Sequence, residues 1–324
     1  MKLILSGILA TTALTVGLSQ AHAQYPEHAI SMVVSYAPGG GTDLVARAIA
    51  PYIQKYLGDG ANIVVLNRPG AGGAIGFSEI KRAKPDGYTI GFVNTPNMLT
   101  IPIERKANYH WQDFDLIGNL IDDPDGFAVS GTSDIKTLKD LEKYAKENPG
   151  QVTVGTTGVG SDDHLAMMKF EKLTGTTLNH VPFKGAGEVR NAIQSGQIML
   201  AAMNVGEVLA YQKGGTDIRL LGSMSEQRSA LAPAVPTFKE QGYDVIMASL
   251  RGIAAPRGLP EEVAAKLRVA VQKASEDPEF VAKANAMFVP LRYMDNKTYH
   301  TELDQAEKEF KDLWQASPWS EKTQ

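Results

Sequence analysis

Apolar and polar residues follow one another along the chain in blocks that predict alternating strands and helices. Ile30 to Tyr36 is an apolar run that predicts a strand, and the helical spacing of apolar residues from Leu44 to Leu57 predicts a helix after it. Strands are also expected at Ile63 to Leu66 and Tyr88 to Val93, with a helix from about Ala74 to Ala83 between them. This order favours a parallel, doubly wound sheet.

The pattern resets at Asp122 to Gly126, where Asp-Asp-Pro-Asp-Gly predicts a turn or a crossing between two lobes. A second α/β series then begins with a strand at Phe127 to Ser130, and Val245 to Ala254 predicts a strand that leads back. We therefore expect two doubly wound α/β lobes with a hinge. Lobe 1 is expected to hold residues 24–124 plus 248–324, and lobe 2 residues 125–247.

The first 23 residues have the pattern of a secretory signal peptide. Lys2 gives a positive end, Leu3 to Leu18 is apolar and small, and Ala21-His22-Ala23 fits a small-x-small cleavage site before Gln24. An ordinary buried N-terminal helix is the alternative. We expect cleavage near Ala23/Gln24 and a mature protein in the periplasm, and no later run of about 18 apolar residues predicts a membrane span.

Composition excludes several classes of function. The formal net charge is −4, and no Lys/Arg cluster offers the basic stripe that nucleic acid needs. Cysteine is absent, so no disulfide, thiolate metal site or cysteine nucleophile can form. Neither G-x-S-x-G nor H-E-x-x-H occurs, so no enzyme and no cofactor are predicted.

A glycine-rich loop joins the first predicted strand to its helix, and it supplies the main candidate site. Its residues are Tyr36, Pro38, Gly39, Gly40, Gly41, Thr42 and Asp43. A helix N-terminus carries unpaired N–H groups and a partial positive charge, so the loop can seat a carboxylate or phosphate. A plain strand-to-helix turn is the alternative, because Walker and G-x-G-x-x-G spacings are both missing. Thr42 is the expected N-cap, and Pro51 should kink or break the helix.

A second loop of the same kind follows the strand predicted at Val152 to Gly155. Its candidate residues are Thr156, Thr157, Gly158, Gly160 and Ser161, ahead of a helix from about Asp162 to Leu173. Ligands of open α/β sheets lie beyond the carboxyl ends of strands. If the chain crosses twice between the lobes, both helix N-termini face one cleft and can hold a carboxylate between N–H and hydroxyl groups.

The order of short motifs resembles that of a known receptor family. The motifs are Tyr25-Pro26, Tyr36-Ala37-Pro38-Gly39-Gly40-Gly41-Thr42-Asp43, Asn67-Arg68-Pro69-Gly70-Ala71-Gly72-Gly73, Pro85-Asp86-Gly87-Tyr88-Thr89, Gly160-Ser161 with His164-Leu165, His180-Val181-Pro182-Phe183-Lys184-Gly185, and Val235-Pro236-Thr237. In this register they are similar to tripartite tricarboxylate transporter (TctC/Bug-type) solute receptors. The resemblance implies a type II periplasmic binding protein-like fold and a non-enzymatic receptor for organic anions.

Acidic residues in the two first helical turns are open to more than one interpretation. Asp43, Asp162 and Asp163 are ordinary partners of a helix dipole, or one of them pairs with the ammonium group of an amino-acid solute. A metal site made of Asp162, Asp163 and His164 is a further alternative. Adjacent residues rarely converge on one ion, so no metal is predicted.

The remaining candidates are single residues near the expected cleft. Lys184 either meets the solute or braces its loop, and His164, Asn94 and Asn204 complete the candidate set. Arg251 departs from the resembled family, which usually has an aromatic residue before this glycine. A guanidinium binds carboxylate in bidentate fashion, so we expect Arg251 to hold a second anionic group, with an outward-facing surface arginine as the alternative.

These observations predict a periplasmic receptor for a small organic anion, a di- or aromatic carboxylate. The expected partners are the solute and the membrane permease subunits of a tripartite transporter. A ligand sensor that feeds a two-component kinase is an alternative, and a secreted enzyme acting on an organic acid is a second. No nucleic acid partner is expected.

Overall fold

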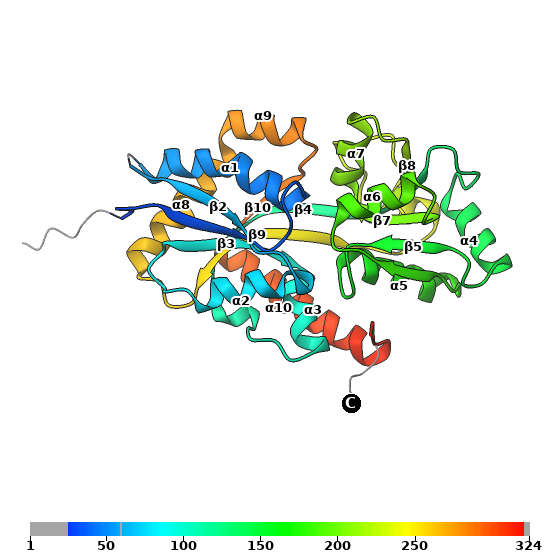
Figure 1. The fold of residues 1–324 in the computed structure, drawn as a ribbon, viewed down its shortest axis with the longest axis horizontal. Coiled ribbons are helices and arrows are strands. Elements are labelled where there is room, and N and C mark those ends of the chain that lie inside the picture. Colours follow the sequence, from blue (N-terminus) through cyan, green and yellow to red (C-terminus); the bar gives the residue numbers. More distant parts are fainter. Residues whose placement is uncertain (1–24, 59, 321–324) are drawn as a thin grey trace, which may run out of the picture.

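The computed structural model describes residues 25–58 and 60–320, and these form two α/β lobes side by side (Figure 1). The sheet of lobe 1 has the strand order β2-β1-β3-β9-β4, with β10 paired to the free edge of β4. The strands of lobe 1 are β1 (Ile30–Val34), β2 (Ile63–Asn67), β3 (Thr89–Thr95), β4 (Phe114–Ser130), β9 (Ala248–Pro256) and β10 (Leu291–Asp295). Strands β1, β2 and β3 run parallel, as predicted, whereas β9 is antiparallel to both β3 and β4.

Helices cover both faces of the lobe 1 sheet because strand residues point alternately to opposite sides. In β1, Ile30 and Met32 pack in the core with one set of helices, and Val33 packs with the other. The first set is α1 (Gly41–Leu57), α8 (Glu261–Glu276) and α9 (Pro278–Ala286). The second set is α2 (Ala74–Arg82), α3 (Asn97–Glu104) and α10 (Asn296–Ala316).

Lobe 2 repeats this layering on a smaller sheet. Parallel strands β5 (Thr153–Thr156), β6 (Asn179–Pro182) and β7 (Leu200–Asn204) carry it, and the far half of β4 pairs antiparallel with β7 and with β8 (Ile218–Ser223). Helices α4 (Leu138–Glu147) and α5 (Asp162–Thr174) pack on one face, and α6 (Ala186–Gln194) and α7 (Val205–Lys213) on the other. Both lobes are therefore doubly wound.

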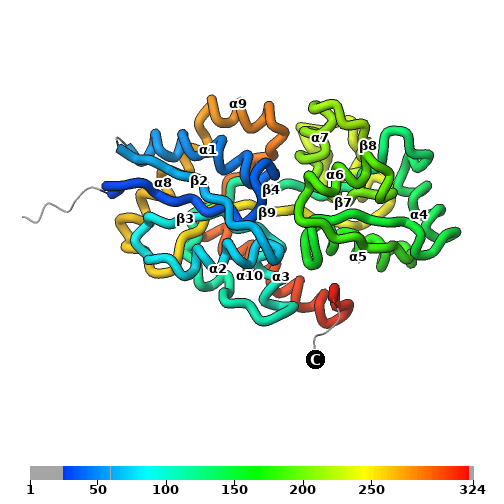
Figure 2. The backbone as a smooth tube through the Cα atoms, viewed as in Figure 1, coloured from blue at the N-terminus to red at the C-terminus, as the bar shows by residue number. Residues whose placement is uncertain are grey.

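Two long strands connect the lobes, as the course of the backbone in Figure 2 shows. Strand β4 passes from the sheet of lobe 1 into that of lobe 2, and β9 pairs with it from Pro124↔Ala248 back to Phe114↔Pro256. Of the two interpretations of Asp122 to Gly126, a turn or a crossing between lobes, the structure has the crossing. These residues lie inside β4, where ladder hydrogen bonds keep the backbone extended.

Other local predictions need correction. Thr42 is not the N-cap, because Gly40 occupies that position with extended backbone and Thr42 is already helical. Helix α1 also continues past Pro51, so the predicted break is absent. Pattern reading missed helix α3 and strand β10.

The predicted signal peptide, residues 1–23, lies outside the described residues, and so does its cleavage site. Within the described chain, no helix combines the length and the apolar character that a membrane crossing requires.

Candidate functional site

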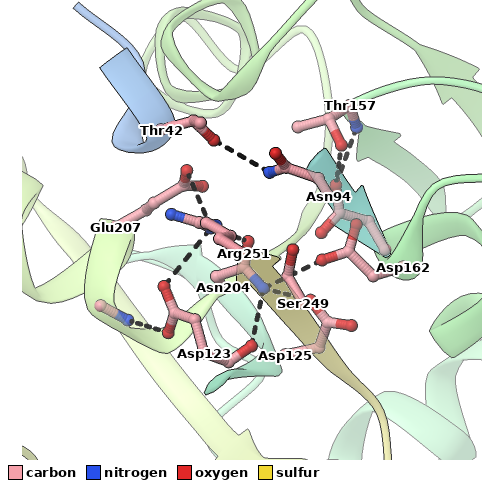
Figure 3. A network of polar contacts seen from close by, with 12 residues as sticks. Thr42, Asn94, Asp123, Asp125, Thr157, Asp162, Asn204, Glu207, Ser249 and Arg251 are labelled. Atoms are coloured by element: carbon pink, nitrogen blue, oxygen red, sulfur yellow. Dashed lines mark hydrogen bonds and ion pairs between the residues drawn. The ribbon is translucent and has the colours of Figure 1, made fainter. Parts of the chain in front are cut away.

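The glycine-rich loop between β1 and α1 places the start of α1 at the face of lobe 1 that meets lobe 2. Strand β1 ends at Val34 and α1 begins at Gly41, so the first-turn N–H groups point out beyond the carboxyl end of the strand. Glycine at 39 is required by its backbone, which has a φ of +82°. Thr42 is buried, and its hydroxyl oxygen accepts a hydrogen bond from Asn94 Nδ2 at 2.9 Å (Figure 3).

Asp43 is tied within lobe 1. Its carboxylate accepts from the Gly39 N–H at 2.8 Å, from Arg47 Nε at 3.0 Å and from Asn67 Nδ2 at 2.8 Å. Burial alone would raise the pKa of Asp43, but these hydrogen bonds lower it below its usual value. Asp43 therefore stays ionised and braces the glycine loop.

The second loop precedes α5 in lobe 2 and has a true side-chain cap. Ser161 Oγ accepts from the His164 N–H at 3.2 Å and donates to the Gly158 carbonyl at 2.8 Å. Thr157 donates through its N–H and its hydroxyl to Asp163 Oδ2, at 2.8 and 2.6 Å. These hydroxyls already serve the loop itself.

Binding of a solute by these hydroxyls therefore stays a prediction, and it would have to replace or share the hydrogen bonds that they already make. Thr156 Oγ1 also has a partner, His180 Nε2, at 2.7 Å. Of the four hydroxyls predicted for the cleft, those of Thr156, Thr157 and Ser161 are bound inside lobe 2. Only Thr42 accepts its hydrogen bond and keeps its own proton available to donate.

Asn204, at the end of β7, makes hydrogen bonds to buried groups on both strands that connect the lobes, β4 and β9. Its Nδ2 donates to the Asp123 carbonyl at 3.0 Å, to Asp125 Oδ1 at 2.9 Å and to Asp162 Oδ2 at 3.0 Å. Its Oδ1 accepts from Arg251 Nη2 at 2.8 Å. Asn204 thereby links α5, β4 and β9 in one polar network (Figure 3).

Arg251 lies in the middle of this network. Its side chain is 5 % exposed, so the alternative of an outward-facing surface arginine is wrong. Nη2 lies 3.5 Å from Asp123 Oδ2 and 3.6 Å from Glu207 Oε1. Burial alone would lower the pKa of Arg251, but these acids and Asp162 raise it, so the guanidinium stays charged.

Five buried carboxyl groups lie in or beside this network, whereas Arg251 is its one cation. Burial is the largest cause that raises the pKa of each of five carboxyls, which are Asp123, Asp125, Asp162, Asp163 and Glu207. The pKa of Asp123 reaches about 7, with Arg251 holding it down in part. The pKa of Asp125 is raised well above its usual value by burial and then by the neighbouring carboxylates of Asp162 and Asp163.

The acidic group in the structure differs from the set Asp162, Asp163 and His164 that the sequence offers as a metal site. Side-chain oxygens of Asp125, Asp162 and Asp163 lie within 4.8 Å of one another. His164 does not join them, because its Nδ1 accepts from the Gly160 N–H at 3.2 Å and its ring stacks on His180 at 3.8 Å. Burial and the neighbouring His180 lower the pKa of His164 to about 3. His164 is thus a neutral packing residue of lobe 2.

A cavity of about 150 Å³ opens directly beside the start of α1. Gly39, Gly41, Asp123, Glu207 and Arg251 form its polar end. Its other walls are mainly apolar, from Leu44, Ala210, Tyr211, Met287, Phe288 and Val289. A larger hollow of about 330 Å³ lies between α3 and α10, but no residue of either glycine loop lines it, so its size does not make it the better candidate.

Not every predicted residue reaches this site. The Lys184 side chain is exposed, and it is the main-chain N–H of this residue that donates to Glu188 at 3.1 Å, so a role for its ammonium group stays a prediction. Pro38 is exposed at the tip of the glycine loop. Tyr36 lies on the lobe 1 side, near enough to Asp162 for that acid to contribute, after burial, to a raised tyrosine pKa.

Sequence reasoning missed Asp123, Asp125 and Glu207. The two aspartates share one side of β4 because residues two apart in a strand point the same way, a signal hidden by reading the segment as a turn. Glu207 carries the signal of an acid in a first helical turn directly after a strand. That pattern is common, and only the contact with lobe 1 distinguishes this glutamate.

Comparisons with known proteins place these features in a family. The family described as "Tripartite tricarboxylate transporter family receptor" matches residues 45–316. A Cupriavidus necator protein named for its place in the gbd 5′ region is 33 % identical over 300 residues, which cover 91 % of this chain and 90 % of that protein.

Solved structures of periplasmic binding proteins are similar to this chain in fold. The periplasmic binding protein BugD has a TM-score of 0.82 at 28 % identity, covering 90 % of this chain and 98 % of BugD. A Rhodopseudomonas palustris protein, MatC, solved with bound malate, has a TM-score of 0.81 at 23 % identity, covering 89 % of this chain and 99 % of that chain. At that identity the second likeness shows the fold alone.

Proposed function

The chain belongs to the tripartite tricarboxylate transporter receptor family, and we propose that it captures a small organic acid between its lobes for delivery to the permease subunits of such a transporter. Members of the family are periplasmic solute-binding receptors, and their fold is that of receptors rather than enzymes. We assign no catalytic step to the site.

One observation carries the proposal: the start of α1 already accommodates a carboxylate. The Glu207 carboxylate lies against Gly41, where an added Cβ would be 2.7 Å from Glu207 Oε1, and Arg251 Nη2 lies 3.6 Å from the same oxygen. A solute carboxylate in the same place would gain the helix N-terminus, the Thr42 hydroxyl and the guanidinium. Hydrogen bonds to charged groups contribute about 1.5–3 kcal/mol each. Several of these support a dissociation constant on the order of 1 μM after the cost of association.

The cavity beside this position favours a compact, largely apolar solute body. A cavity of about 150 Å³ has the volume to hold a molecule about the size of benzene. Arg251 is the one cation in the network, and the acids around it would repel a second negative group on the solute. An aromatic carboxylate therefore fits the site better than a dicarboxylate does. Arg251 binds the first carboxylate in this proposal, not a second anionic group.

Closure follows from the two crossing strands. We place the lobe boundaries at residues 124/125 and 247/248, in β4 and just before β9, so that a hinge motion there separates the α1 start from α7. Contacts of one solute to both lobes would stabilise the closed form.

Export is part of the proposal. The family is periplasmic, and we infer cleavage of the leader between Ala23 and Gln24. The intact mass of protein isolated from the periplasm tests this directly. A mass that still includes residues 1–23 would contradict it.

A thermal-shift panel tests the solute class. Benzoate, phthalate, succinate, malate and citrate are compared at matched ionic strength, with neutral benzamide as the control for the charge. Benzoate at 100 times its dissociation constant should stabilise the protein by about 2.7 kcal/mol, and benzamide should not. Equal stabilisation by benzamide would contradict a carboxylate site. Tighter binding of succinate or malate than of benzoate would contradict the aromatic class alone.

A further inference from the structure

Glu207 occupies a place that the proposed function reserves for the solute. It is the third residue of α7 in lobe 2, yet its carboxylate lies against Gly41 at the start of α1 in lobe 1. The approach is close. A Cβ placed on Gly41 would lie 2.7 Å from Glu207 Oε1 and 2.6 Å from Arg251 Nη1.

The surroundings make this contact stable in the absence of a solute. The Glu207 side chain is 14 % exposed, so its charge has lost most of its hydration. The helix N-terminus and Arg251 replace that hydration, in the way that a carboxylate is bound elsewhere in proteins. Arg251 and Asp123 come from the two crossing strands, so the contact joins both lobes at their hinge.

We propose that Glu207 is an internal carboxylate that holds the α1 seat in the ligand-free protein, latches the lobes together, and must be displaced by the carboxylate of the solute. This inference rests on the proposed function for the identity of the seat. Glu207 then sets the affinity threshold of the receptor. Only an acid that binds α1 and Arg251 better than Glu207 does, with help from its own body in the cavity, opens the latch and enters.

The latch can be measured without any ligand. The sequence has no cysteine, so introduced cysteines can be labelled selectively. Lys283→Cys on α9 and Gln194→Cys on α6, both at exposed positions, place one spin label on each lobe. Double electron–electron resonance measures the distance between the two labels, and the doubly labelled parent protein should show a single population at short distance. The variant Glu207→Ala should shift population to longer distances, because the charge that joins α7 to α1 is gone.

Matched controls separate the latch from a general change in a helix. Glu188 is the third residue of α6, the same position in the neighbouring helix, but its carboxylate binds the Lys184 N–H within lobe 2. Glu188→Ala should leave the distances unchanged. Gly41→Ala should separate Glu207 from α1 by steric clash while every charge is retained. Gly40→Ala is its control and should leave the distances unchanged, because a Cβ at Gly40 would meet only the Ala37 carbonyl oxygen, at 3.6 Å.

Calorimetry with benzoate tests the competition. Glu207→Ala should bind benzoate about tenfold more tightly, which corresponds to about 1.4 kcal/mol, and Glu188→Ala should match the parent. If the distance between the two spin labels is the same as in the parent in both Glu207→Ala and Gly41→Ala, the proposal that Glu207 latches the lobes is wrong. Unchanged or weaker benzoate binding by Glu207→Ala would overturn the competition. Failure of the parent to bind any acid of the panel would instead refute the proposed function, while the ligand-free distances still test the latch.

Discussion

Arg251 Nη2 donates a hydrogen bond of 2.8 Å to Asn204 Oδ1, and this bond joins the crossing strand β9 to the end of β7 in lobe 2. Asn204 in turn donates to groups on β4 and α5. The cation at the hinge is therefore positioned by both lobes. The account of the site depends on that placement, and the following predictions probe it.

Replacing Arg251 by alanine should destabilise the protein strongly. The change leaves Asp123 and Glu207 buried without their cation, and breaking a buried ion pair in this way costs about 3–5 kcal/mol. Urea unfolding at pH 8 measures the loss. Arg257→Ala is the matched control, because Arg257 is exposed just beyond the end of the same strand and should change stability by less than about 0.5 kcal/mol. A loss of similar size in both variants would contradict a compensating role for Arg251.

The pH dependence of stability should report Asp123. Burial raises its pKa to about 7, so between pH 4 and 7 the folded state holds a proton that the unfolded state has released. The contribution of Asp123 to the free energy of unfolding therefore falls as pH rises through this window. Asp123→Asn mimics the protonated form and removes that dependence.

From pH 5 to pH 8, Asp123→Asn should gain about 2–3 kcal/mol of stability relative to the parent. The other buried groups that titrate near it, including Asp162 and Glu207, are present in both proteins and largely cancel in the difference. Denaturant unfolding at both pH values gives the comparison. A difference that does not vary with pH would show that Asp123 is ionised throughout the range.

Thr42→Val should affect both stability and binding. Its hydroxyl is the acceptor of the buried Asn94 amide, and leaving that donor unsatisfied costs about 1–3 kcal/mol. The same hydroxyl has a proton to donate to a carboxylate at the α1 start, so benzoate affinity should fall about tenfold or more. Urea unfolding and calorimetry measure the two effects.

Thr301→Val is the control for the Thr42 variant. Thr301 is exposed on α10, and its hydroxyl donates to the Lys297 carbonyl of its own helix. Both quantities should stay near the parent values in this control. Retained benzoate affinity in Thr42→Val would remove Thr42 from the site.

The sequence predicted those parts of the site that depend on local information. The strand, glycine loop and amphipathic helix that lead to α1 are consecutive in the chain, and so are those that lead to α5. Each loop could therefore be placed at a helix N-terminus from spacing alone. The doubly wound order of lobe 1 followed from the same pattern.

The partners of Arg251 could not be predicted in this way, because they come from β4, β7 and α7 and meet it only in the folded chain. Asp, Pro and Gly are turn formers, so the segment with Asp123 and Asp125 has a turn as one of its two interpretations, but pairing of β4 with two other strands overrides that propensity. The hydroxyls of Thr157 and Ser161 also have partners that the sequence does not reveal. Their spacing places them at the loop, but it does not show that the loop already uses them.

A crystal structure with the acid that binds most tightly in the thermal-shift panel tests the central claim most directly. The account predicts a solute carboxylate within hydrogen-bond distance of the Gly41 N–H and the Arg251 guanidinium, its body in the cavity beside Leu44 and Tyr211, and Glu207 moved away from α1. An acid bound elsewhere, with Glu207 still in place at Gly41, would contradict it.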